Sequence, residues 1–578
     1  MRGSDVIIEM LIAHGVEHVF GVPGDTSMHF HNSFFHRKNR INHILCHDER
    51  NAGYMADAYA RVSGKVGVVE TPSGGGALYV VPAVSEAYNS CIPMLCLSSD
   101  IGLVSIEQGS LTDIDQEALM KPITKWNQKI KIGSKIPYLF RKAFRMATGG
   151  VPGAVHLALP ENILEDEVKF TNEELKGSGL TGCNSPFRYG PCDSDLTLVA
   201  EMFMNAKRPI ILSGGGVHLS DAYKELAKVV ETFHLPLATS INGKGAISEL
   251  SQYSIGVVGA NGGSMEGLEI VQKADFVLAL GSKLNNVTTI GKTLFNDSCR
   301  IAQVDIGENL LDANIRTNIA IMSDIKAFLE KLLEIMKAKG LEDPSRLDTW
   351  NKFVCQKMQE KQARIQKDVE KEEDLVTPAY FFNMLWNLTD EDTYFIADAG
   401  TPTPYLSSYF RQKKAGRQTV LPRAHGSLGY ALPASMGVQV AKPGHKVIAL
   451  HGDASFCMAA GELETAVRCK LPIVFINFQN YAYGWIKTIQ KLYFDETYFA
   501  VDFGKSIDVE TVAKGFGLNA KTVYNNSQVK DKLTWALHQD GPVMLNLMIE
   551  PPTKTIPPVL KWEKDAAKPA DKRIKLTY

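Results

Sequence analysis

The 578-residue sequence has no long apolar run, no paired cysteines and almost no net charge. Its longest apolar runs, such as residues 447–450, are strand-sized and far short of the roughly 20 residues that a membrane-spanning helix needs. The nine cysteines form no CxxC pair and no cluster with histidine, which argues against structural zinc and fits a reducing compartment. A net charge of −2 gives no electrostatic case for nucleic acid or an anionic membrane as partner. The N-terminus enters an amphipathic pattern directly, without a secretory signal, so we expect a cytoplasmic protein.

The length exceeds what one hydrophobic core usually supports, which favours three domains. Short apolar strands alternate with helix-length segments along the chain, as is typical of parallel sheets covered by helices. We therefore predict an α/β fold of three doubly wound domains with mainly parallel sheets. The predicted divisions are domains at 1–175, 190–340 and 375–550, a linker rich in Gly, Ser and Pro at about 176–193, and a tail, either flexible or a lid, at 551–578.

Two polar segments follow neighbouring predicted strands in the third domain. Gly452-Asp453-Ala454-Ser455 ends one strand and Asn480 follows the next, so Asp453 and Asn480 are expected at the same edge of the sheet. The small residues beside Asp453 let backbone approach phosphate closely. Carboxylate, amide and backbone carbonyl oxygens are the ligands that Mg²⁺ takes beside phosphate. A plain strand-to-helix turn with Asp453 as the helix cap is the competing interpretation.

This spacing resembles the thiamine diphosphate enzyme family, in which Gly-Asp-Gly is followed some two dozen residues later by Asn-Asn. Here Asp453 and Asn480 are 27 positions apart, Ala454 replaces the third glycine, and Gln479 replaces the first asparagine. The resemblance implies thiamine diphosphate and Mg²⁺ as cofactors. Its implied metal ligands are Asp453, Asn480 and the backbone of Ala482, and its implied diphosphate contacts include Gly452, Ala454 and Ser455.

A second part of the resemblance lies in residues 47–61, which read His-Asp-Glu-Arg-Asn-Ala-Gly-Tyr-Met-Ala-Asp-Ala-Tyr-Ala-Arg. They are similar to the glutamate helix of this family, which makes Glu49 the candidate activating acid. A carboxyl that bonds to the aminopyrimidine of the cofactor works best partly desolvated, with its pKa drawn toward neutrality. For an isolated glutamate, an acid favoured by the helix dipole would be the simpler interpretation.

A third part of the resemblance lies in residues 423–433, where Gly426 and Leu428 match a Gly-x-hydrophobe-Gly stretch. It implies that Leu428 supports the bent cofactor from below and that the backbone of Gly426 and Leu428 holds the pyrimidine. The loop at 398–403 matches a diphosphate-contact loop, so Thr401 and Thr403 are implied hydroxyl donors. Because the family builds its site from the first domain of one subunit and the third domain of another, the resemblance also implies a homodimer with shared sites, often a homotetramer.

Over the whole chain the sequence looks closest to acetolactate synthase large subunits, which implies a decarboxylating carboligase acting on a small 2-oxo acid. Val22-Pro23-Gly24-Asp25 instead resembles pyruvate decarboxylases, which makes Asp25 a candidate for proton transfer, with a turn residue as the alternative. Residues 111–115 lack the glutamine that the synthases carry there. Non-oxidative decarboxylation, cleavage of a 2-hydroxyacyl thioester and a non-catalytic relative stay open. His29, His31 and His425 are alternative proton carriers.

The middle domain leaves a further cofactor open. Three glycines at 214–216 follow a strand, which is weak evidence for a nucleotide. Flavin-bearing relatives place arginine after the glycine of a later strand, whereas Gly281 is followed here by Ser282 and Lys283. FAD and an ADP-type nucleotide therefore both stay open. A nicotinamide dehydrogenase is disfavoured, because no complete Gly-x-Gly-x-x-Gly follows a strand beside a ribose-binding acid.

Overall fold

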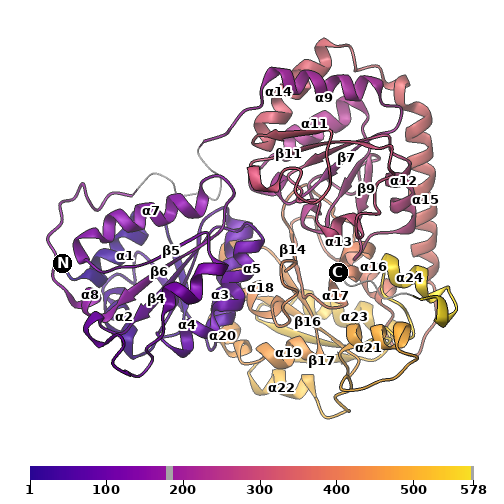
Figure 1. Cartoon of the computed structure of the whole chain (residues 1–578). Coiled ribbons are helices and arrows are strands. Elements are labelled where there is room, and N and C mark those ends of the chain that lie inside the picture. Colours follow the sequence, from indigo (N-terminus) through magenta and orange to yellow (C-terminus); the bar gives the residue numbers. More distant parts are fainter. Residues whose placement is uncertain (178–186, 574–578) are drawn as a thin grey trace.

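The computed structural model describes residues 1–177 and 187–573, and Figure 1 shows three α/β domains in chain order. Each domain contains one six-stranded sheet, and every pairing between the described strands of these sheets is parallel. The predicted α/β class with parallel sheets is thus confirmed. Residues 178–186 of the predicted linker lie outside the described part. Among the helices of the described residues, none combines the length and apolarity that a membrane crossing requires.

The first sheet has the order β2-β1-β3-β4-β6-β5, and its central strands are buried along their whole length because helices cover both faces. One face packs on α1 and α7, and the other packs on α3 and α5. The strands are β1 (His18–Gly21), β2 (Asn42–Leu45), β3 (Gly67–Thr71), β4 (Met94–Asp100), β5 (Trp126–Lys129) and β6 (Ala154–Pro160). The helices are α1 (Gly3–Ala13), α2 (Met28–Phe35), α3 (Glu49–Ser63), α4 (Gly75–Tyr79), α5 (Val81–Asn89), α6 (Gln116–Met120), α7 (Ile136–Thr148) and α8 (Glu161–Glu165).

The second sheet has the order β12-β11-β10-β7-β8-β9. Helices α9, α11 and α14 cover one face, and α12 and α15 cover the other. The strands are β7 (Pro209–Ser213), β8 (Leu237–Thr239), β9 (Ser254–Val257), β10 (Phe276–Leu280), β11 (Arg300–Asp305) and β12 (Ile319–Met322). The helices are α9 (Asp193–Asn205), α10 (Gly216–Ser220), α11 (Tyr223–Phe233), α12 (Met265–Lys273), α13 (Asn286–Thr289), α14 (Ile325–Ala338) and α15 (Asp348–Val369).

The third sheet, β14-β13-β15-β16-β18-β17, repeats the strand order of the first. Helices α16, α17 and α23 cover one face, and α18, α20 and α22 cover the other. The strands are β13 (Tyr394–Ala397), β14 (Thr419–Val420), β15 (Val447–Gly452), β16 (Ile473–Gln479), β17 (Asn519–Val523) and β18 (Val543–Met548). The helices are α16 (Pro378–Leu388), α17 (Pro402–Tyr409), α18 (Ala431–Ala441), α19 (Asp453–Ala459), α20 (Glu462–Arg468), α21 (Gly484–Tyr493), α22 (Val509–Gly515), α23 (Asn526–Leu537) and α24 (Leu560–Ala566).

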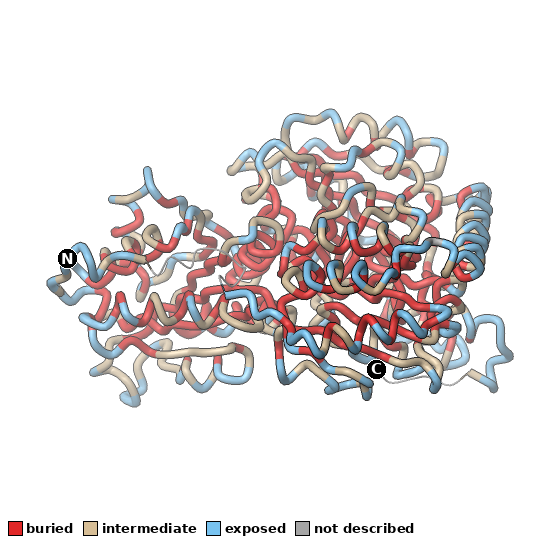
Figure 2. The backbone as a smooth tube through the Cα atoms, turned by 90° about the horizontal axis from the view of Figure 1, so that it is seen from above, coloured by how far each residue is buried: buried red, intermediate tan, exposed pale blue. Residues whose placement is uncertain are grey.

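The first and third domains are joined through α3 and α18, whose side chains belong to one hydrophobic core. The two helices approach so closely that a Cβ on Gly437 would lie 2.0 Å from the carbonyl oxygen of Met55, so only glycine fits there. The Tyr54 and Tyr430 rings meet edge to face, with centroids 5.1 Å apart. Figure 2 shows the buried backbone inside both domains. The junction therefore fixes the two sheets relative to each other.

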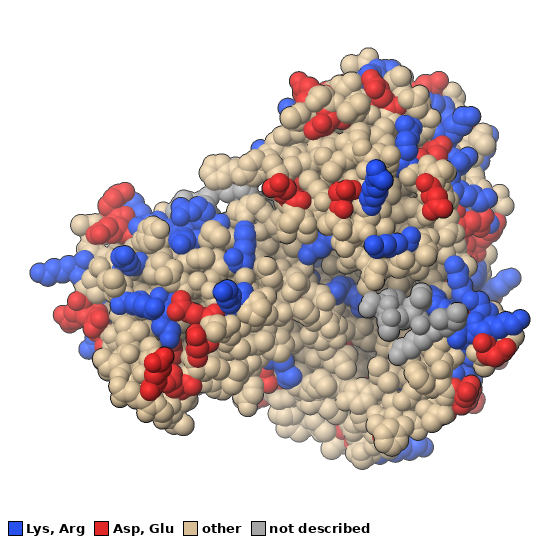
Figure 3. All heavy atoms as spheres, viewed as in Figure 1, with Lys and Arg blue, Asp and Glu red and all other residues tan. Residues whose placement is uncertain are grey.

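The strand order of the third sheet sets the position of a ligand site. The chain passes from β13 to β14 at one edge and then places β15 on the opposite side of β13. Loops after β13 and β15 thus diverge and leave a crevice outside the carboxyl ends of the strands, where open α/β sheets bind ligands. The outer surface of the molecule is mixed in charge, with Lys and Arg interspersed among Asp and Glu on the face of Figure 3.

Candidate active site

A cavity of about 620 Å³ lies at the carboxyl ends of β13, β15 and β16. It brings together nearly all the predicted cofactor residues, which arrive from four separate loops. Those that line it are Thr401, Gly426, Leu428, Gly452, Asp453, Ala454, Ser455, Asn480 and Ala482. Thr403 is the exception, because its side chain is fully buried and its hydroxyl donates a 2.5 Å hydrogen bond to the carbonyl oxygen of Asp398. Thr403 therefore holds the loop rather than facing the cavity.

Asp453 is the first residue of α19 and follows β15 directly. Because β15 pairs with β16 in register from Val447–Ile473 to Gly452–Phe478, Asn480 arrives beside it. One Asp453 oxygen, Oδ2, accepts the N–H groups of Asn480 at 2.9 Å and Tyr481 at 2.6 Å. Burial raises the pKa of Asp453, and these N–H groups counteract part of the increase. The carboxylate is thus held in a fixed orientation at the edge of the cavity.

Gln479 and its neighbours form a polar layer beneath this edge. The Gln479 side chain is buried and donates to the carbonyl oxygen of Ile507 at 2.9 Å. Its Oε1 accepts from Asn546, and Asn546 Oδ1 accepts from Asn477 at 2.9 Å. Gln479 is not part of the cavity lining. The replacement of the first asparagine of the family signature therefore leaves the donor set at the cavity intact.

The donor set suits a hard divalent cation beside a diphosphate. Asp453 supplies a carboxylate, Asn480 an amide oxygen and Ala482 a backbone carbonyl, which are the oxygen ligands that Mg²⁺ binds. Gly452 and Ala454 offer little side chain between the backbone and a phosphate, and α19 directs its N-terminal N–H groups to the same place. The residues present therefore fit both Mg²⁺ and the diphosphate of thiamine diphosphate.

Asp398 is a further acid at the cavity that the sequence motifs did not single out. It follows β13, is 1% exposed, and accepts the N–H of Tyr430 at 3.1 Å. Burial raises its pKa to about 6, although the Ser455 hydroxyl and backbone N–H groups counteract the shift. The sequence could have identified Asp398 as a candidate, because it directly follows the apolar residues 394–397 at the end of a predicted strand. Its bond to Tyr430 ties the loop after β13 to the start of α18.

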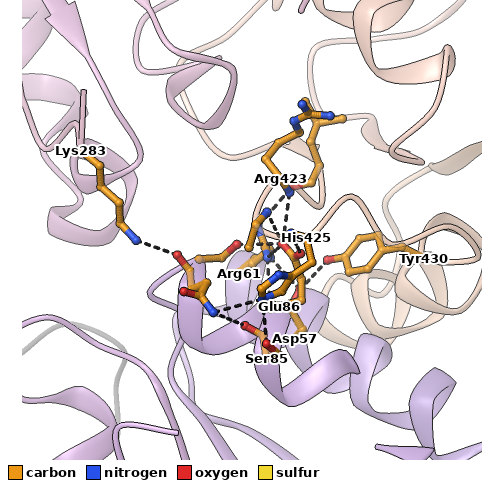
Figure 4. Close-up of polar contacts among 12 residues, drawn as sticks. Asp57, Arg61, Ser85, Glu86, Lys283, Arg423, His425 and Tyr430 are labelled. Carbon is orange, nitrogen blue, oxygen red and sulfur yellow. Dashed lines mark hydrogen bonds and ion pairs between the residues drawn. The ribbon is translucent and has the colours of Figure 1, made fainter. Parts of the chain in front are cut away.

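The segment that leads to Gly426 and Leu428 is held by a glutamate of the first domain (Figure 4). Glu86, on α5, accepts the backbone N–H groups of Arg423 at 3.1 Å, Ala424 at 3.2 Å and His425 at 3.1 Å. Arg61 lies 3.3 Å from the same carboxylate. The segment then turns at Gly426, whose φ of +65° is in the left-handed region.

Arg61 also connects this network to α18. Its guanidinium forms two bonds with Asp57, at 2.7 and 3.2 Å, and the Tyr430 hydroxyl donates to Asp57 at 2.5 Å. Arg61, Asp57 and Glu86 are almost completely buried. Asp57, Arg61 and Tyr430 lie within the motifs at 47–61 and 423–433, but the sequence did not indicate that Glu86, which lies outside both motifs, joins them.

Glu49 lies at the N-terminus of α3, next to its capping residue Asp48. It is 8% exposed, and burial raises its pKa, with the Asp48 and Glu70 carboxylates acting in the same direction. A Cβ on Gly76 would come within 2.9 Å of Glu49 Oε1, so the absence of a side chain at Gly76 leaves space for this carboxyl. Among the described residues, none from the first domain lines the cavity of the third. The structure therefore does not bring Glu49 into the cavity of its own chain.

Asp25 also lies apart from the cavity lining. It begins the short turn Asp25–Ser27 after β1 and is exposed. The adjacent Thr26 is bonded to Ser73 at 3.0 Å and to Ser99 at 2.8 Å, and Ser73 donates to Thr112 at 2.8 Å. Asp25 and Thr112 thus belong to one loop cluster at the carboxyl edge of the first sheet.

The outer wall of the cavity comes from α21 and from the tail. Trp485, Ile489 and Tyr493 recur at four-residue spacing on α21 and line the cavity. In α24, Lys561 and Trp562 line it too, and the Trp562 ring lies 4.4 Å from that of Trp485. Lys561 and Trp562 of the tail are therefore part of the cavity wall. The apolar spacing in α21 was a detectable signal, whereas nothing local in the tail indicated where it packs.

A second cavity, of about 310 Å³, lies at the carboxyl ends of β7, β10 and β11. Gly216 and Gly281 are in such close contact there that a Cβ on Gly216 would lie 2.6 Å from the Cα of Gly281. The lining includes Asp305 at the end of β11, and its cations are Arg188, Lys283, Arg417 and Arg423.

Comparison with known proteins agrees with this geometry. Residues 1–119, 196–332 and 398–547 match, respectively, the N-terminal TPP binding domain, the central domain and the C-terminal TPP binding domain of thiamine pyrophosphate enzymes. A probable acetolactate synthase large subunit of Methanocaldococcus jannaschii is 29% identical over 557 residues, which cover 95% of this chain and 92% of the relative. The acetolactate synthase isozyme 3 large subunit of Escherichia coli is 27% identical over 540 residues, covering 93% of this chain and 92% of the relative.

The three matches follow the three sheets in chain order, and the matched C-terminal segment contains the cavity residues from Asp398 to Trp485. Family signature, sheet topology and cavity thus agree. The chain belongs to the thiamine pyrophosphate enzyme family.

Proposed function

We propose that this chain is a thiamine diphosphate- and Mg²⁺-dependent decarboxylating carboligase that acts on a small 2-oxo acid, as its similarity to acetolactate synthases suggests. The observation that carries the proposal is the fixed Asp453 carboxylate, which two backbone N–H groups orient beside Asn480 at the edge of the cavity. Asp453 and Asn480 would hold Mg²⁺, and the metal would neutralise the charge of a diphosphate bound beside them.

Bound thiamine diphosphate supplies a nucleophilic carbon and an electron sink, which permit the bond beside a 2-oxo acid carbonyl to break. The protein has to hold the metal, orient the rings and manage protons. Asp453 and Asn480 would hold the metal, while Leu428 would support the rings between Gly426 and Gly429. Glu49, with its raised pKa, would hold and release a proton at its carboxyl group. The aromatic wall of α21 and α24 would keep water from the reacting carbon.

We further propose that the working unit is a dimer, because Glu49 is not part of the cavity lining of its own chain. A cavity formed by the third domain of one protomer would then be completed by the first domain of the other. Asp25 and Thr112 lie on the same edge of the first sheet and would come with Glu49. This arrangement extends to a tetramer if two such dimers associate.

Mixing two inactive variants tests the shared site. Glu49→Gln keeps the side-chain volume but removes the titrating carboxyl, so turnover of pyruvate should fall at least about a hundredfold. Asp453→Asn should also be inactive. A refolded mixture of the two should regain activity, because a mixed dimer contains one site with both native residues. Glu464→Gln, at an exposed glutamate paired with His47, is the control for a neutralised acid near α3. If mixing restored nothing while each variant still dimerised, sites shared between subunits would be ruled out.

The second candidate function is simple decarboxylation to an aldehyde, or cleavage of a 2-hydroxyacyl thioester. Two features favour it. Asp25 is exposed and so available for proton transfer, and Thr112 lies in the segment 111–115, which lacks the glutamine that synthases carry there. Product analysis by NMR with pyruvate separates the two. Acetolactate would support ligation, whereas free acetaldehyde would support decarboxylation.

The second cavity would bind an ADP group, the part that FAD and ADP-type nucleotides share. Its arginines and Lys283 match a diphosphate, and Asp305 at the strand end suits ribose hydroxyls. The absorption spectrum and mass spectrum of the purified protein would identify the occupant. Flavin bands would indicate FAD, and absorption at the adenine band alone would indicate a nucleotide without flavin.

A further inference from the structure

Three potential metal ligands meet in the first domain, away from the cavity described above. His31 on α2, His43 on β2 and Glu70 on β3 direct one atom each to a common point, with all three atoms within 4.8 Å of one another. His43 Nε2 lies 2.9 Å and His31 Nε2 lies 3.4 Å from the same Glu70 oxygen, Oε1. The three residues come from separate elements, so the fold rather than the sequence spacing creates the cluster.

The spacing of these atoms suits a single bound cation. Ligands about 2.0–2.1 Å from a zinc ion stand roughly 3.3 Å apart in a tetrahedral site and about 2.9 Å apart in an octahedral one. The two nitrogen–oxygen separations, 2.9 and 3.4 Å, lie near these values. Two imidazoles and one carboxylate are also a recurring ligand set for Zn²⁺ and its first-row neighbours, with a further position open to water.

Hydrogen bonding accounts for His43, whose Nε2 lies 2.9 Å from Glu70 Oε1, but poorly for His31. His31 Nε2 is buried and lies 3.4 Å from the same oxygen, and it forms no hydrogen bond of good geometry within the described residues. A buried polar atom that lacks a good hydrogen bond is costly, and a metal bond would remove that cost. Glu70 is 1% exposed, and a Cβ on Gly21 would lie 2.3 Å from its Oε1, so only glycine at 21 leaves space for this carboxylate.

The surroundings are suited to hold and admit an ion. Phe34 packs edge to face on His43, with centroids 5.3 Å apart, and the His31 and His43 rings are 5.0 Å apart. These contacts restrict ring rotation. The two histidine side chains are 18% and 15% exposed, which leaves a path from solvent.

We propose that His31, His43 and Glu70 form a binding site for one divalent first-row transition-metal ion, with Zn²⁺ as the preferred occupant. This site is separate from the Mg²⁺ site at Asp453 and does not depend on the proposed reaction. The ion would fasten α2 to β2 and β3. Because the Asp25–Ser27 turn directly precedes α2, the ion would also fix the loop that carries Asp25.

Cobalt provides the direct probe. The full-length protein, stripped of metal and kept free of thiamine diphosphate, is titrated with Co²⁺ while visible absorption is followed. We expect ligand-field bands that saturate at one equivalent per chain, that Zn²⁺ abolishes, and that excess Mg²⁺ leaves unchanged. Zn²⁺ should also raise the thermal midpoint of the protein.

Variants assign the site. His43→Gln and His31→Gln should each lose the one-equivalent bands, with circular dichroism confirming that the chain is folded. His29→Gln is the discriminating control, because His29 is also on α2 but belongs, with Glu161 and Glu165, to a different group of residues that could hold a metal ion. It should keep the bands. Absence of stoichiometric Co²⁺ and Zn²⁺ binding to the wild type would overturn the proposal, as would equal binding by folded His43→Gln or loss of binding in His29→Gln.

Discussion

Replacing Glu86 by glutamine tests whether the first domain positions the segment before Gly426. Oε1 of Glu86 accepts from Arg423, Ala424, Ser90 and Arg61, and Oε2 accepts from His425. A glutamine can keep its oxygen at the first position, but its NH₂ group then faces the N–H of His425. One charge-assisted hydrogen bond is lost and two donors oppose each other inside the protein.

The magnitude follows from that geometry. A hydrogen bond to a charged group contributes about 1.5–3 kcal/mol, so Glu86→Gln should destabilise the fold by about 3 kcal/mol. Glu86→Ala leaves all three N–H groups without an acceptor and should cost about 4–5 kcal/mol. The Glu86→Gln change also weakens the hold on the segment that leads to Gly426 and Leu428. If this weakening costs about 1.4 kcal/mol of cofactor binding energy, the Kd for thiamine diphosphate rises about tenfold.

Calorimetric titration with thiamine diphosphate in the presence of Mg²⁺ measures the affinity, and thermal unfolding measures the stability. Ser85→Ala is the matched control, because Ser85 is only half-buried and bonds to His425 at 2.7 Å, whereas the hydrogen bonds of Glu86 go to other groups. It should change the midpoint and the Kd little. If Glu86→Gln behaved like Ser85→Ala in both assays, the idea that Glu86 holds the cofactor segment would be refuted.

Three further predictions concern the metal, the cavity wall and pH. Asp453→Asn should weaken Mg²⁺-dependent cofactor binding by about a hundredfold, roughly 2.8 kcal/mol. The negative charge is lost, and the NH₂ group of the new asparagine can face the N–H groups of Asn480 and Tyr481. Unchanged binding would exclude Asp453 as a metal ligand. Lys561→Met should raise the KM for an anionic substrate about tenfold, whereas Lys568→Met, which removes another partner of Asp565 outside the cavity, should not. Burial lowers the pKa of His218 from 6.5 to about 3, so this group supports stability above pH 6.5 and loses that contribution as the pH falls toward 3. The loss is about 2 kcal/mol at pH 5; His218→Gln should flatten the fall of the thermal midpoint between pH 7 and 5, and an unchanged slope would contradict this.

The parts of the site that follow strands directly were predictable from the sequence. Asp453 and Asn480 each come one residue after a buried strand, and parallel pairing then forces them together at one sheet edge. No comparable rule applied to Thr403, whose position in the loop at 398–403 suggested a cofactor contact but whose hydroxyl is used by Asp398. Loop side chains are directed by tertiary contacts that a local pattern does not encode.

The remaining parts depend on packing between distant segments. Glu86 matches no motif, and it gains its role only because the α3–α18 junction brings residue 423 to α5. The tail was predicted as flexible or a lid, and its sequence could not reveal that Trp562 packs on Trp485. Placing such residues requires the complete arrangement of the domains, since the contacts span dozens to hundreds of residues.

The core shared by α3 and α18 has a consequence for the way this chain is made. Helix α3 is complete at Ser63, but α18 begins only at Ala431. At ribosomal rates of about 5–20 residues per second, roughly 20–70 s pass between the synthesis of α3 and that of α18, which covers its apolar face. During that interval Tyr54, Met55 and their neighbours are exposed to other nascent chains. We expect the yield of folded protein to depend on chaperones that cover this face, and to fall when synthesis is faster than their supply.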